Sequence, residues 1–111
     1  MDPNAAHIIG FALEVSLEEV DYLIQVARAQ QSLASVERLR EYREALAAIR
    51  AEFSATSENL QELADKTDAI ASDLAHIEEL LEVGENEQGF HCALAAMRLS
   101  GEAKFARGDI A

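Results

Sequence analysis

The chain has 111 residues, a formal net charge of −12 and an apolar fraction of 50%. This length predicts one domain, and the apolar fraction excludes a disordered chain. The strong negative charge disfavours nucleic acid and anionic membranes as direct ligands, so a charged partner should be basic.

The first predicted element is a helix over residues 4–31. Asp2 followed by Pro3 is typical of a helix start, because the carboxylate can cap the first turn and the proline ring is preset for it. The alternation of apolar residues over 9–17 would also suit a strand. A helical projection gathers the polar residues in one narrow stripe, which favours a helix, either straight or kinked at Ser16.

This helix carries apolar side chains on two sides. One side suits the core of a bundle and consists of Ile9, Leu13, Leu17, Val20, Ile24 and Ala27. The second side consists of Ile8, Phe11, Val15, Tyr22 and Val26. A surface helix needs only one apolar stripe, and a domain this small is expected to cover only one. The second side therefore predicts a homodimer or contact with an obligate protein partner.

The next segment has an unbroken heptad pattern of core positions. These positions are Leu39, Tyr42, Leu46, Ile49, Phe53, Thr56, Leu60, Leu63, Thr67, Ile70, Leu74, Ile77 and Leu81. Two structures share this pattern. One is a single helix over the whole segment in a coiled coil. The other is a hairpin of two helices that turns within residues 54–59, where serine, threonine and asparagine favour a turn.

The charges beside the heptad positions favour the hairpin. In a parallel coiled coil, Arg38 would face Arg43, and Asp73 would face Glu78, so both pairs would repel. In a hairpin, Arg38, Arg43 and Arg50 lie beside the acidic second arm instead. An antiparallel pairing between two molecules satisfies the charges equally well, and exposed ion pairs contribute little.

The remainder of the chain predicts a fourth helix. Gly84 is expected just after the end of the preceding helix. The fourth helix should cover residues 89–100 and end at Ser100 and Gly101. One face of it consists of Phe90, Ala93, Leu94 and Met97. Residues 102–111 either add one turn or fray.

The predicted fold is therefore all-α, an antiparallel bundle of about four helices that dimerises. Residues 1–111 form one domain, and Phe105 and Ile110 would anchor the last turn if it forms. The single cysteine, Cys92, excludes an internal disulfide and fits a reducing compartment. No signal peptide or membrane span is predicted, so a cytoplasmic location is expected.

No catalytic, metal-binding or cofactor-binding residues are predicted. Asp73 with His76 and Glu87 with His91 have spacings that suit metal ligands on a helix, but the inward heptad positions supply no further ligands. His91 cannot easily serve as a base for Cys92, because adjacent residues on a helix point about 100° apart. His76 has acidic rather than basic neighbours, which disfavours phosphotransfer.

Acidic side chains concentrate in residues 57–88, which hold ten carboxylates and one lysine. Six of them share outward positions on the predicted third helix: Glu58, Glu62, Asp65, Asp68, Glu79 and Glu82. An outward acidic face ordinarily keeps a protein soluble. It can also occupy a basic groove that binds nucleic acid, because rows of carboxylates can replace phosphates.

The sequence favours a non-enzymatic protein–protein interaction module, which would be an adaptor, a small regulator or a subunit of a complex. The alternative is an acidic inhibitor that mimics nucleic acid and blocks a protein that binds it. Phosphotransfer or catalysis at a metal site in the bundle is a third hypothesis, which the apolar heptad positions disfavour.

Overall fold

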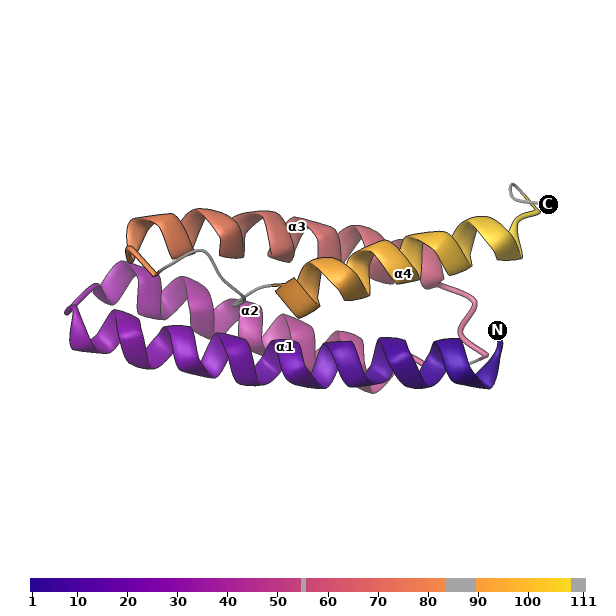
Figure 1. Ribbon diagram of the computed structural model, residues 1–111, viewed down its shortest axis with the longest axis horizontal. Coiled ribbons are helices and arrows are strands. Elements are labelled where there is room, and N and C mark those ends of the chain that lie inside the picture. Colours follow the sequence, from indigo (N-terminus) through magenta and orange to yellow (C-terminus); the bar gives the residue numbers. More distant parts are fainter. Residues whose placement is uncertain (55, 84–89, 109–111) are drawn as a thin grey trace.

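A computed structural model describes residues 1–54, 56–83 and 90–108 and contains, within these ranges, four helices and no strand. The helices are α1 (Pro3–Ala29), α2 (Leu33–Glu52), α3 (Leu60–Leu80) and α4 (Phe90–Ala106). They lie lengthwise side by side in a body of 48 × 24 × 20 Å (Figure 1). In the ranges just given, no helix combines the length and the hydropathy that crossing a membrane requires.

The helix predicted for the first segment is confirmed. Asp2 caps α1, with its carboxylate accepting a hydrogen bond from the backbone N–H of Asn4 at 3.4 Å, and Pro3 occupies the first turn. The helix continues through Ser16, whose buried hydroxyl donates to the carbonyl of Ala12 at 2.7 Å. This bond satisfies the hydroxyl within the helix, so Ser16 does not end it.

α1 and α3 end in the same way, at residues other than glycine. Gln31 has a φ of 60° and Glu82 a φ of 56°, and the N–H of the residue after each one bonds to a carbonyl five residues back. The side chain of Gln30 also donates to the carbonyl of Leu81 at 2.7 Å, which joins the two helix ends. The sequence predicts that the third helix ends just before Gly84, but α3 ends three residues earlier than that, at Leu80, and Glu82 takes the left-handed position; Gly84 itself lies outside the described residues.

The heptad segment forms two helices, so the alternative of one long helix is wrong. α2 ends at Glu52 and α3 begins at Leu60, and the interval contains a turn in which the N–H of Ser57 bonds to the carbonyl of Ser54 at 3.1 Å. All of the heptad positions are buried except Tyr42, which is half-buried, and Thr56, which is exposed in the turn region. The heptad pattern therefore identified the core positions correctly. It did not show where α2 ends and α3 begins, which depends on the turn-forming residues between them.

Two of the three arginines predicted to lie beside the second arm bind α1 instead. Arg38 does bind Asp73 of α3, at 2.7 Å. Arg43, however, binds Asp21 at 2.8 Å, and Arg50 binds Glu14 at 3.1 Å. Arg43 and Arg50 are seven residues apart, and so are Glu14 and Asp21. The two ion pairs therefore join two turns of α2 to two turns of α1, and the residue numbers rise along α2 as they fall along α1. The reason is that α2 packs closely on α1 and barely touches α3.

The fourth helix is longer than predicted and turns a different face inward. α4 runs through Ser100 and Gly101 to Ala106, so the predicted end at Ser100 and Gly101 is wrong. Its buried residues are Cys92, Ala95, Ala96, Leu99 and Ala103. Phe90 and Met97, from the predicted face, are exposed, and Phe105 is no anchor because it is 64% exposed; Ile110 lies outside the described residues. Small inward side chains let α4 lie close to its neighbours, which the larger ones would prevent.

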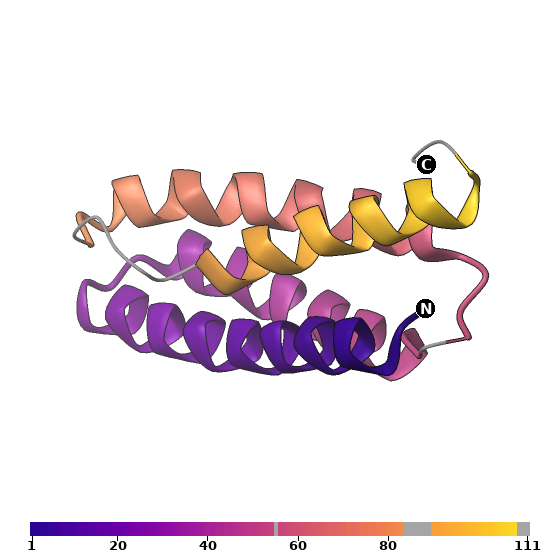
Figure 2. The same ribbon diagram turned by 45° about the vertical axis from the view of Figure 1, so that its right-hand side comes forward.

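The order of the helices around the bundle follows from their contacts. α1 packs on α2 and α4, and α3 packs on α4, whereas α2 and α3 contact each other least. Figures 1 and 2 show α4 in front of the space between α1 and α3, and α2 behind it. One hydrophobic core collects residues from all four helices.

Candidate interaction surfaces

The second apolar side of α1 remains open to solvent. Phe11 is 57% exposed and Tyr22 49% exposed. Ile8, Val15 and Val26 are half-buried, and Val26 also packs against the core. These five residues, named here the α1 stripe, form two apolar stretches along the helix, Ile8 to Val15 and Tyr22 to Val26, with Glu18 and Glu19 between them. Burying such side chains is favourable by about 1.5–3 kcal/mol each, so the stripe has the chemistry of a contact surface.

α4, which packs on α1, carries further exposed apolar side chains. Phe90, Met97 and Phe105 are 60%, 64% and 64% exposed. α4 packs against α1, and the Nδ1 atom of His91 on α4 is hydrogen-bonded to the carboxylate of Glu19 on α1. Sequence reasoning placed Phe90 and Met97 on one face but did not identify that face as the outward one. The sequence contained one feature that could have identified the inward face, which is the second apolar face of this helix, formed by Cys92 and the alanines.

A cluster of titratable groups is enclosed where α1, α3 and α4 meet. It contains Glu19 and Glu78, with His91 and Cys92 on α4. The Oε1 atom of Glu78 is buried and has no hydrogen-bond partner among the described residues. Loss of hydration, and then the nearby charge of Glu19, raise the pKa of Glu78 to about 7. Glu78 is therefore partly protonated at neutral pH.

Cys92 is buried in the core, where it packs as a small apolar side chain. Its thiol donates to the carbonyl of Thr67 at 3.6 Å. Burial, followed by the charges of Glu19 and Asp68, raises the pKa of the Cys92 thiol to about 12. Because the thiolate is the reactive form of cysteine, this environment opposes nucleophilic chemistry.

Asp73 and His76 are the described pair with the spacing of metal ligands, and their surroundings differ. Asp73 accepts hydrogen bonds from Arg38 and Tyr42, while His76 is exposed. Glu87, predicted as the partner of His91, lies outside the described residues. In the ranges that the structure describes, no group of three histidine, cysteine or carboxylate side chains is arranged to hold a metal ion.

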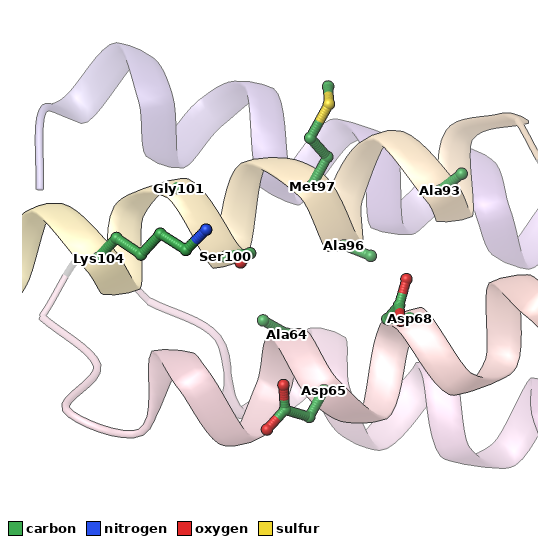
Figure 3. A pocket seen from close by; sticks show the side chains of 9 residues that line it. All are labelled: Ala64, Asp65, Asp68, Ala93, Ala96, Met97, Ser100, Gly101 and Lys104. Atoms are coloured by element: carbon green, nitrogen blue, oxygen red, sulfur yellow. The ribbon is translucent and has the colours of Figure 1, made fainter. Parts of the chain in front are cut away.

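The six predicted acidic residues are all exposed but do not form one uniform face. Glu62 forms an ion pair with Lys66 at 3.0 Å, and Asp65 accepts a hydrogen bond from Gln61 at 2.9 Å. Asp65 and Asp68 line a hollow of about 470 Å³ between α3 and α4, where Lys104 also lies (Figure 3). Figure 3 shows that Met97 points away from these acids. The other acids are Glu58, Glu79 and Glu82.

Comparison with known proteins finds no match to this chain among family models, curated proteins or solved structures. The function is therefore inferred from the chemistry of these surfaces.

Proposed function

We propose that this chain is a non-enzymatic protein–protein interaction module, an antiparallel helical bundle that acts as an adaptor, a small regulator or a subunit of a complex. The observation that supports this most strongly is the exposure of Phe11 and Tyr22 on the α1 stripe. Large aromatic side chains are enriched where proteins contact each other, because they bury much surface at little cost in conformational freedom.

The first partner to expect is a second copy of the chain. Four of the five residues of the α1 stripe are arranged almost symmetrically about a point near residues 16 and 17, whereas Val15 has Glu18 and Glu19 at the corresponding positions. When two copies of α1 lie antiparallel, Phe11 faces the partner's Tyr22, and Ile8 faces the partner's Val26. A two-fold interface of this kind uses the same residues on both molecules. It would place four exposed or half-exposed apolar side chains from each copy in a shared contact.

Sedimentation equilibrium at high micromolar concentration tests this interface. We expect a dimer for the unaltered chain, and a folded monomer for Phe11→Glu and for Tyr22→Glu, with unchanged circular dichroism. Gln25→Glu, which adds a charge at an exposed polar position of the same helix, is the matched control and should remain dimeric. High salt should not weaken a dimer held by apolar contacts. A monomeric unaltered chain would exclude the homodimer and leave a different protein as the occupant.

A second candidate function is inhibition of a nucleic-acid-binding protein by charge mimicry. It is favoured by Glu58, Asp68, Glu79 and Glu82, which are exposed and have no ion pair or side-chain hydrogen bond with other described residues. Carboxylates in such positions are available to arginine and lysine of a target. Binding of this kind should weaken steeply with salt and be displaced by added DNA or RNA. Binding that is insensitive to both would contradict mimicry.

A further inference from the structure

The space between α2 and α3 forms an apolar groove. These two helices contact each other much less than α1 and α2 or α3 and α4 do, and a hollow of about 510 Å³ lies between them. Ile49 and Ile70, both almost fully buried, line its inner part. Tyr42 lines one end, where its hydroxyl is hydrogen-bonded to Asp73. The groove is therefore apolar inside and held in shape at that end.

Small side chains border the groove along both helices. Ala45 and Ala48 of α2 and Ala69 of α3 are exposed and line it. Because an alanine side chain ends at Cβ, another helix can come close to both backbones here. An apolar groove between two helices is the geometry that receives the apolar face of an amphipathic helix.

The edge of the groove is acidic. Glu41 and Glu52 both line it from α2 and lie about 16 Å apart along the helix axis, at 1.5 Å per residue. Neither has an ion pair or side-chain hydrogen bond with another described residue. Lys66 also lines the groove; its ion pair with Glu62, and to a smaller extent the charge of Glu52, raise the pKa of its ammonium group. Two carboxylates therefore line the groove against one ammonium group that is already paired with Glu62, so the edge keeps a negative charge and attracts cations.

We propose that the groove between α2 and α3 binds an amphipathic helix of another protein, with an aliphatic face flanked by two basic residues about three turns apart. The aliphatic face covers Ile49 and Ile70, and the two basic side chains reach Glu41 and Glu52. The groove lies across the bundle from α1 and α4, given the order in which the helices contact one another. The inference is therefore independent of the α1 stripe.

A synthetic helical peptide provides the probe. It carries leucines on one face and two lysines three turns apart beside them, and a fluorescent label reports its binding to the full chain by anisotropy. A second peptide of identical composition, with the leucines scattered around the helix, controls for charge alone. We expect the first peptide to bind at least about tenfold more tightly than the second.

Variants of the full chain locate the peptide. Ala69→Phe and Ala45→Phe fill the groove and should weaken binding by about tenfold, whereas Ala51→Phe, at an exposed position of α2 outside the groove, should not. Glu41→Lys with Glu52→Lys should also weaken binding. Glu58→Lys with Glu79→Lys makes the same change in net charge away from the groove and should leave binding nearly unchanged. Circular dichroism checks that each variant is folded.

Three results would overturn the assignment. Equal weakening by both lysine pairs would show a general attraction to an acidic protein. Peptide-induced shifts of amide signals at Phe11 and Tyr22, with none at Ala45 and Ala69, would place the peptide on the α1 stripe. Dissociation of a dimer of this chain by Ala69→Phe would show that the groove belongs to a second copy.

Discussion

The guanidinium group of Arg50 lies over Gly10 and binds the carboxylate of Glu14 one turn further along α1. A Cβ atom at position 10 would lie 3.5 Å from Cζ and Nη2 of Arg50, which is ordinary van der Waals contact. The space beneath Arg50 therefore accommodates a methyl group at position 10. Glycine is also less favourable than alanine inside a helix.

Gly10→Ala should therefore stabilise the protein, by about 0.5–1 kcal/mol, because alanine restricts the unfolded chain more than glycine does. Gly101→Ala is the matched comparison, since a Cβ atom at position 101 in α4 has nothing within 4 Å. Urea unfolding followed by circular dichroism measures both. Loss of stability at position 10 together with a gain at 101 would mean that the methyl group disturbs Arg50 or its ion pair with Glu14, and would contradict this account.

The left-handed residues at the ends of α1 and α3 give a second prediction. Gln31 and Glu82 have positive φ angles, which cost side chains with a Cβ atom roughly 1 kcal/mol and cost glycine little. Gln31→Gly and Glu82→Gly should each raise the free energy of unfolding by about 0.5–1 kcal/mol. Gln31→Val should lower it, because a β-branched residue fits this conformation poorly. Equal free energies of unfolding for Gln31→Gly and Gln31→Val would contradict this account.

The stability of the protein should fall as the pH rises through the range in which Glu78 ionises. The folded chain holds the proton of Glu78 up to a pKa of about 7, whereas the ordinary value is 4.5, so the folded state binds more protons between these values. Unfolding then becomes easier as pH increases. Because the carboxyl group is only partly enclosed, the expected loss between about pH 5 and pH 8 is about 1–2 kcal/mol.

Glu78→Gln should remove this loss, since the amide has no charge to bury. The variant should match the unaltered chain near pH 5 and exceed it in stability near pH 8, as measured by urea unfolding at a series of pH values. Glu79→Gln, at the exposed neighbouring position, is the control and should leave the pH dependence as it was. Parallel pH profiles for the unaltered chain and Glu78→Gln would show that Glu78 does not carry the effect.

Cys92 should be inert to thiol reagents in the folded protein. Burial raises the pKa of its thiol to about 12 and also blocks access, so both requirements for reaction are missing. A disulfide reagent such as Ellman's should react slowly in buffer and quickly in concentrated urea. The reaction in buffer should then report transient unfolding. Rapid reaction of the native protein would show that α4 opens readily.

The sequence determined the helical elements and most of the core through periodicity. The heptad positions from Leu39 to Leu81 are inward because a side chain recurs on the same side of a helix every seven residues, whatever lies opposite. Asp2 and Pro3 fixed the start of α1 for a similarly local reason. The exposure of Phe11 and Tyr22 also follows from the sequence, because one helix cannot bury both apolar sides in a domain of this size.

Only the tertiary structure decided which partners each helix meets. By charge alone, Arg43 and Arg50 could pair with acidic residues of α3 as well as with those of α1. Because α2 packs closely on α1, they pair with Asp21 and Glu14. The inward face of α4 depended on the space that its neighbours leave, which alanines fill and Phe90 does not. The raised pKa of Glu78 arises from its enclosure near Glu19, two residues far apart in the chain. Local patterns carry no information about such distances, because packing between helices sets them.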